Sequence, residues 1–196
     1  QGATAREMLR CVTPAARSVL DLFCGSGAVL IEAIAAGRQV VGCDVSPLAV
    51  FVATHQCDAN GVDLKEILTL AEAAAAATAG DDSSEGGWQA LRRHLRALRR
   101  AGATEVAVDA LWFVLAVALQ RAVDAGAMGA VPELALPRAN SGFLLPRPSL
   151  ADPEGRHAAP LFLASARRYI ARLQDLRRAA GGRPHVALHR SDCREL

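Results

Sequence analysis

The sequence predicts an α/β fold built on a parallel sheet, of the doubly wound kind that binds nucleotide-like ligands. Three features near the amino end indicate this fold: an apolar run, VLDLF, at residues 19–23, a glycine turn, CGSG, at residues 24–27, and a second apolar run, QVVGC, at residues 39–43. Short apolar runs of this length are typical of buried parallel strands. The helix-forming segment between them completes a strand–helix–strand unit, and Asp44 follows the second strand.

The glycine turn is the predicted ligand site. Gly25 and Gly27 carry no Cβ, so the chain can reverse there and bring its backbone close to a ligand. Asp44 stands about 20 residues after Gly25, the separation that a strand–helix–strand unit requires. A carboxylate at this strand end can accept hydrogen bonds from both hydroxyls of a ribose.

The residues of the turn favour S-adenosylmethionine over a dinucleotide. The dinucleotide fingerprint is G-x-G-x-x-G, and Leu30 occupies the position of its third glycine. Asp21, just before the turn, would repel a pyrophosphate but attract an ammonium group. S-adenosylmethionine carries an ammonium, a sulfonium and a ribose, and it carries no phosphate. We therefore expect this cofactor, and a nucleotide-dependent oxidoreductase is the less favoured alternative.

Two segments resemble motifs I and II of the amino-methyltransferases that act on DNA. They are DLFCGSGAVLIEA at residues 21–33 and GRQVVGCDVSPLAV at residues 37–50, and VALHRSDCREL at residues 186–196 is a weaker match to motif III. Leu22 and Ala28 replace the proline and threonine that are usual in motif I, without removing a charge or a turn glycine. The resemblance implies a Rossmann-like S-adenosylmethionine-dependent methyltransferase fold.

The resemblance also implies roles for individual residues. Asp21 and the glycine turn would hold the methionine end of the cofactor, Asp44 the ribose, and Asp192 the adenine amino group. Asp192 has an alternative role, because an aspartate often caps a strand end or a turn. The expected cofactor-binding residues are Asp21, Phe23, Cys24, Gly25, Ser26, Gly27, Asp44, Val45, Asp192 and Cys193.

The catalytic motif of that family, [DNS]-P-P-[YFW], has no counterpart in this sequence. The sequence contains no Pro-Pro dipeptide, and Tyr169, its one tyrosine, lies in a basic helical run. We therefore expect an incomplete sheet, catalytic residues outside this chain, and a chain that binds the cofactor without methylating. An open edge on the first strand is a liability, so we expect the missing catalytic segment or a partner chain to cover it.

The middle of the chain reads as an insertion. The cofactor-binding core is expected at residues 1–62 and 183–196, with a mainly helical insertion at residues 63–182. Two of its helices are rich in arginine, and rows of arginine can follow a phosphate backbone. Solvated helix faces over buried leucines are the alternative. The candidate nucleic-acid contacts are Arg92, Arg96, Arg99, Arg168 and Arg172.

Composition limits the remaining possibilities. The net charge of +2 is too small to indicate nucleic-acid binding by itself. Five cysteines without a C-x-x-C pair favour reduced thiols in a cytoplasmic protein over disulfides or a metal site. The longest apolar run, Val106–Leu119, is too short to span a bilayer.

The sequence therefore predicts the S-adenosylmethionine-binding part of a DNA methyltransferase that acts on an exocyclic amine of adenine or cytosine. An RNA methyltransferase acting on guanine amino groups and a non-catalytic, methyltransferase-like binding subunit remain as alternatives. The target base and the recognition sequence stay open.

Overall fold

The computed structural model describes residues 2–11, 16–79, 86–124, 133–135, 144–146 and 157–195. The chain divides into two compact units, each described by itself below. Unit 1 comprises Gln1–Gly61 and Ala171–Leu196, and unit 2 comprises Val62–Ile170. The long helix α7 (Ala158–Ala179) begins in unit 2 and ends in unit 1.

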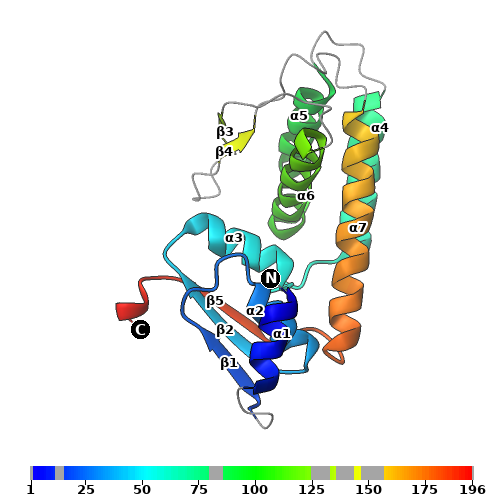
Figure 1. Ribbon diagram of the computed structural model, residues 1–196. Helices are drawn as coiled ribbons and strands as arrows, with labels where there is room; N and C mark the ends of the chain where they lie inside the picture. Colours follow the sequence, from blue (N-terminus) through cyan, green and yellow to red (C-terminus); the bar gives the residue numbers. More distant parts are fainter. Residues whose placement is uncertain are drawn as a thin grey trace. The chain divides into compact units, whose positions relative to one another are not determined.

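Unit 1 contains the predicted parallel sheet. Its strands are β1 (Ser18–Asp21), β2 (Gln39–Asp44) and β5 (Val186–Arg190), in the order β1-β2-β5 (Figure 1). Both pairings are parallel, and the sheet is open. The α/β fold class with an incomplete Rossmann-like sheet is thus confirmed.

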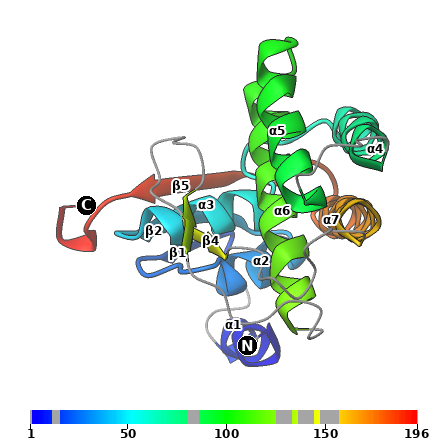
Figure 2. The ribbon, with the colours of Figure 1, turned by 90° about the horizontal axis from the view of Figure 1, so that it is seen from above.

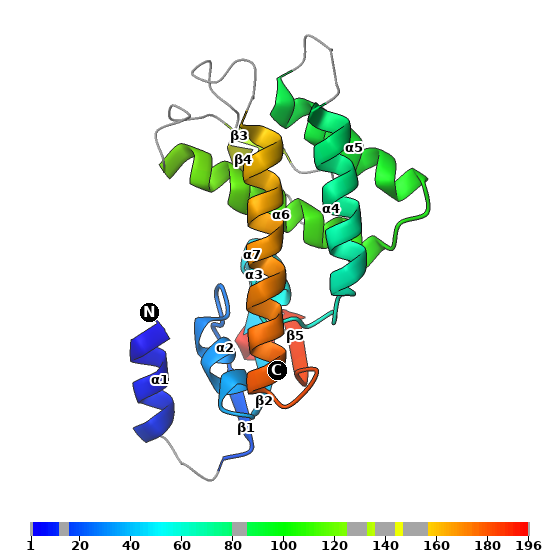
Figure 3. The same ribbon diagram turned by 90° about the vertical axis from the view of Figure 1, so that its right-hand side faces the viewer.

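One face of this sheet is covered. The register aligns Val19, Val40 and Val186, and these residues join a core with α2 (Ala28–Ala35), α3 (Pro47–Gln56) and the end of α7. Helix α1 (Gly2–Cys11) lies alongside α2, where Arg6 Nε donates to Glu32 Oε2 at 2.8 Å (Figure 3).

The other face of the sheet is open among the described residues. The register there aligns Leu20, Val41 and Ala187, since successive side chains of a strand alternate between faces. Leu20 is 61% exposed. An apolar row with this much exposure is unusual in a parallel sheet, whose faces are normally both covered.

Arginines of the returning chain hold the turn that follows α3. Arg177 makes a two-point ion pair with the buried carboxylate of Asp58, with Nε–Oδ2 and Nη2–Oδ1 distances of 2.5 and 3.0 Å. Arg183 donates to the carbonyl oxygen of Asn60 at 2.8 Å. Hydrogen bonds and an ion pair between segments that are far apart in the sequence therefore hold unit 1 together.

Unit 2 is mainly helical. It contains α4 (Leu64–Ala79), α5 (Gly87–Arg100), α6 (Glu105–Asp124) and the first part of α7 (Figure 2). A short antiparallel pair, β3 (Glu133–Ala135) with β4 (Leu144–Pro146), lies within the segment expected to be mainly helical. Each of these strands has only three residues, too few for an alternating pattern in the sequence.

Helix α6 forms the apolar centre of unit 2. Leu111 and Leu115 are fully buried, and the ring of Phe113 lies 5.5 Å from that of Tyr169 on α7. Thr104 Oγ1 accepts a hydrogen bond from the Ala107 amide and so caps the helix. In the part of the chain that the structure describes, none of the helices combines the length and apolar character that a membrane crossing requires.

Candidate functional site

The candidate site lies at the carboxyl ends of the three parallel strands. Open α/β sheets bind their ligands at this edge. The segments there are residues 22–27 after β1, residues 45–46 after β2 and residues 191–193 after β5. Because parallel strands end on the same side, the fold brings together residues that are far apart in the sequence.

Asp44 connects two of these segments. Its Oδ2 accepts a hydrogen bond from the Gly25 amide at 2.9 Å, and its Oδ1 accepts one from the Ser46 amide at 2.9 Å. Each carboxylate oxygen has a second lone pair, so Asp44 can still accept from a ligand hydroxyl. The carboxylate therefore fixes the glycine turn and also faces the ligand edge.

The two turn glycines have different roles. Gly25 has a φ of +51°, and a Cβ placed there would meet no atom within 4 Å. Gly27 has a φ of +84°, and a Cβ there would lie 3.0 Å from Cys57 Sγ and 3.3 Å from Ala53 Cβ. Gly27 thus allows α3 to pack against the turn, and Gly25 leaves open space beside it for a ligand.

Asp21 stabilises the start of the turn. Its Oδ1 accepts a hydrogen bond from the Phe23 amide at 3.1 Å. This contact spans two residues, as in an Asx turn. Asp21 is the last residue of β1, and its side chain is partly exposed to solvent.

Exposed apolar side chains surround the turn. Phe23 is 77% exposed, Val45 is 63% exposed, and Leu22 and Leu48 are also exposed. Clustered apolar side chains on a surface indicate a binding site more often than isolated ones do. Phe23 and Val45 are among the expected cofactor-binding residues, and Leu48 lies in the first turn of α3.

Cys24 contributes its backbone to the turn, and its thiol lies in the core. Its amide donates to the Cys43 carbonyl at 2.9 Å. Burial, followed by the negative charges of Asp44 and Asp21, raises the pKa of the Cys24 thiol to about 11. Burial also raises the pKa of the Cys57 thiol to about 12. Both thiols therefore stay protonated at neutral pH and are poor nucleophiles.

Asp192 caps the turn after β5. Its Oδ1 accepts from the amide and the Nε of Arg194, at 3.0 and 2.9 Å, and the guanidinium also binds Oδ2. These hydrogen bonds hold the pKa of the Asp192 carboxyl below its usual value. Cys193, half-buried, begins the short 3-10 helix η1 (Cys193–Glu195). Asp192 thus lies at the carboxyl end of the sheet. Its hydrogen bonds to Arg194 are those of an aspartate that caps a turn, which is the alternative role given above.

The candidate nucleic-acid arginines differ in their surroundings. Arg99 forms ion pairs with Asp109 and Glu105, with N–O distances of 3.3 and 3.4 Å, and Arg172 donates to Gln56 at 2.7 Å. Arg92 is half-buried, and its pKa is lowered by burial and then by the charge of Arg96. Arg96 and Arg168 are exposed.

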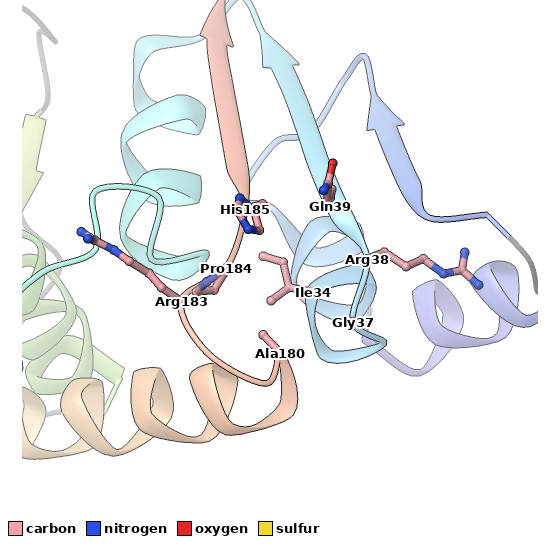
Figure 4. A pocket seen from close by; sticks show the side chains of 8 residues that line it. All are labelled: Ile34, Gly37, Arg38, Gln39, Ala180, Arg183, Pro184 and His185. Atoms are coloured by element: carbon pink, nitrogen blue, oxygen red, sulfur yellow. The ribbon is translucent and has the colours of Figure 1, made fainter.

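A small cavity lies at the opposite edge of the sheet, where β2 and β5 begin (Figure 4). Its volume is about 50 Å³, which suits one or two water molecules rather than a cofactor. Figure 4 shows the Arg38 and Arg183 side chains pointing away from it. The lining residues are Ile34, Gly37, Arg38, Gln39, Ala180, Arg183, Pro184 and His185.

Metal ligands are not assembled in the described part of the chain. There, no group of three or more His, Cys, Asp or Glu residues has an arrangement that could hold a metal ion. The residues that gather at the ligand edge are carboxylates, backbone amides and apolar groups. Such a set suits an organic ligand with hydroxyl and ammonium groups.

Two comparisons with known proteins find a methyltransferase. Residues 2–54 match a family model described as DNA methylase. The chain is also similar to the ribosomal protein L11 methyltransferase of Geobacter sulfurreducens, with 46% identity over 52 residues, which is 26% of this chain and 17% of that protein. No solved structure matches. Both comparisons support a methyltransferase.

Proposed function

We propose that this chain is the S-adenosylmethionine-binding part of a DNA methyltransferase that transfers a methyl group to an exocyclic amine of adenine or cytosine. The observation that carries the proposal is the hydrogen bond between Asp44 and the Gly25 amide, because it builds a strand-end acid and a bare glycine turn into one site. This site lies within the segment that matches the DNA methylase model.

The residues present fit the cofactor. The open space beside Gly25 gives room for the methionine end, and Asp21 supplies a negative charge for its ammonium group. Asp44 would accept hydrogen bonds from the ribose, and Asp192 from the adenine amino group. Phe23, Val45 and Leu48 offer apolar surface.

When bound, S-adenosylmethionine supplies a methyl group on a positively charged sulfur. The residues of this chain hold and orient that group. Orientation of this kind supplies much of the acceleration of a bimolecular transfer. We propose that the polar and aromatic residues that receive the target base lie outside this chain, so that the chain alone binds the cofactor without methylating.

The open side of β1 is where the rest of the enzyme would pack. Strand β1 is an edge strand, and Leu20 is exposed on the open face of the sheet. An unpaired edge beside an apolar surface favours pairing with a further strand. We propose that the segment or partner chain that carries the catalytic motif covers this edge.

The acceptor is the least constrained part of the proposal. The family model is described as DNA methylase, whereas the similar protein is named a ribosomal protein methyltransferase. The residues that match the family model, 2–54, include Asp21, the glycine turn and Asp44. Exposed Arg96 and Arg168 suit a nucleic acid, RNA as well as DNA, and the absent Pro-Pro motif suits a non-catalytic subunit. We expect a cytoplasmic location, since all five cysteines are free thiols.

Titration calorimetry with S-adenosylhomocysteine, the demethylated and stable form of the cofactor, tests the donor site. The unmodified chain is expected to bind it, and Asp44→Ala is expected to weaken binding about 10- to 100-fold through the loss of hydrogen bonds to the ribose. Asp44→Asn keeps one oxygen that can accept from the Gly25 or the Ser46 amide, and it therefore serves as the variant that preserves the turn. Asp175→Ala, which removes an exposed acid of α7, is the matched control. Equal binding by the unmodified chain and the folded Asp44→Ala variant would refute the role of Asp44.

A further inference from the structure

The thiol of Cys43 connects the ends of β2 and β5. Its Sγ lies 3.0 Å from the carbonyl oxygen and 3.2 Å from the Oγ of Ser191. Cys43 is fully buried, and the carbonyl oxygen can only accept, so the thiol is the donor in that contact. Cys43 directly precedes Asp44, and Ser191 directly precedes Asp192.

The bond acts where the strand pairing stops. The last register pair of β2 and β5 is Asp44 with Arg190, so Ser191 lies one residue beyond the sheet. The side chain of Cys43 thus joins Ser191, in the segment after β5, to the end of β2. The hydrogen bonds of Asp192 itself go to Arg194, within the same short segment.

Cys57 provides a comparison. It is also fully buried in unit 1, but its Sγ lies 4.0 Å from the carbonyl oxygen of Gly27, to which it donates. The short thiol contact therefore distinguishes Cys43 from Cys57. It lies where the ends of β2 and β5 meet, beside Asp44 and Asp192. Loss of the Cys43 thiol would leave the position of Asp192 less constrained relative to Asp44.

We propose that Cys43 is a positioning residue for cofactor recognition. Through Ser191 it sets the separation between Asp44 and Asp192, and so it sets how strongly the site prefers a 6-aminopurine in the cofactor. The proposal rests on the proposed function, in which these acids contact the ribose and the adenine amino group.

A pair of ligands isolates this effect. S-adenosylhomocysteine presents an amino group that donates to a carboxylate, and S-inosylhomocysteine presents a carbonyl oxygen at the same place. The ratio of their dissociation constants therefore reports the contact with Asp192. A general loss of stability would weaken both ligands alike and leave the ratio unchanged.

The experiment measures that ratio by titration calorimetry for the full chain and three variants. The unmodified chain is expected to prefer S-adenosylhomocysteine, and Cys43→Ala is expected to reduce the preference about fivefold, the value of one modest hydrogen bond. Cys43→Ser keeps a donor and should restore the preference. Cys57→Ala removes an equally buried thiol and should keep it. In the ligand-free chain, hydrogen exchange of residues 188–195 should rise in Cys43→Ala and not in Cys57→Ala.

The outcomes separate the two proposals. Failure of the unmodified chain to bind either ligand would overturn the proposed function and the role of Cys43 with it. If the unmodified chain prefers S-adenosylhomocysteine and Cys43→Ala keeps that preference in full, the role of Cys43 is overturned and the proposed function is not. Should Cys43→Ala fail to fold, a folded Cys43→Ser variant without the preference would overturn that role.

Discussion

Replacing the two turn glycines by alanine separates a glycine needed for the fold from one needed for the ligand. Gly25 and Gly27 both have positive φ values, +51° and +84°. An L-residue in the left-handed region costs about 1–2 kcal/mol. Both substitutions are therefore expected to lower the free energy of unfolding by about that amount.

Gly27→Ala carries a second cost. Its new Cβ would lie 3.0 Å from Cys57 Sγ and 3.3 Å from Ala53 Cβ, and both of these residues are fully buried. Forcing an extra carbon into a packed core costs about 1–3 kcal/mol. Gly27→Ala is thus expected to be about 1–3 kcal/mol less stable than Gly25→Ala, whose Cβ would meet no atom within 4 Å.

Urea unfolding followed by circular dichroism measures these differences. Gly37→Ala is the matched control, because Gly37 has a φ of +72° in the same unit and its Cβ would also meet no atom within 4 Å. Calorimetry adds the second comparison: Gly25→Ala should fold but lose cofactor binding, and Gly37→Ala should bind normally. The double variant Gly27→Ala with Cys57→Ala should recover part of the lost stability.

Equal stability of Gly27→Ala and Gly37→Ala would refute the packing role of Gly27. Undiminished cofactor binding by Gly25→Ala would refute the assignment of the open space beside that residue to the ligand.

Three further predictions concern buried groups of unit 1. Burial lowers the pKa of His55 to about 4, below its unfolded value of about 6.5. Between these two values the unfolded chain binds a proton that the folded chain does not, so the free energy of unfolding should fall by about 2 kcal/mol from pH 7 to pH 5. In urea unfolding, His55→Gln should flatten this dependence on pH. Arg177→Met leaves the buried Asp58 carboxylate without its guanidinium and should cost about 3–5 kcal/mol by the same method. A thiol reagent at pH 8 should modify exposed Cys11 in the folded chain and reach Cys57 only after unfolding.

Exposed counterparts serve as controls for the first two predictions. His189→Gln removes an exposed imidazole of the same unit and is the matched control for His55→Gln. Arg167→Met breaks an exposed pair with Glu72 and should change stability by less than about 1 kcal/mol. A loss in Arg167→Met as large as that in Arg177→Met would contradict the importance of burial, as would rapid modification of Cys57 in the native chain.

The strand–helix–strand unit could be predicted because its signals are local. The apolar runs, the glycine turn and the acid at Asp44 all lie within residues 19–44, and β5 follows the glycines that end α7. Ser46 caps the first turn of α3, with the Ala49 amide donating to Ser46 Oγ, which is also a local contact. Sequence spacing therefore captures most of what positions the donor site.

Contacts between distant residues could not be predicted in this way. Arg172 was expected as a nucleic-acid contact, yet it binds Gln56, 116 positions earlier. Arg177, on the same helix, binds Asp58, 119 positions earlier. The division of roles between Gly25 and Gly27 depends on where α3 packs, and the Cys43–Ser191 contact depends on the pairing of β2 with β5. Helical periodicity carries no information on any of these contacts.

The most direct test is a crystal structure of the chain with S-adenosylhomocysteine. We expect the ligand at the carboxyl ends of β1 and β2, with its ribose hydroxyls within hydrogen-bonding distance of Asp44 and its amino-acid end over Gly25. A ligand bound at the opposite edge, beside His185, or a turn whose own side chains fill the space next to Gly25, would contradict the assignment of this turn as the cofactor site.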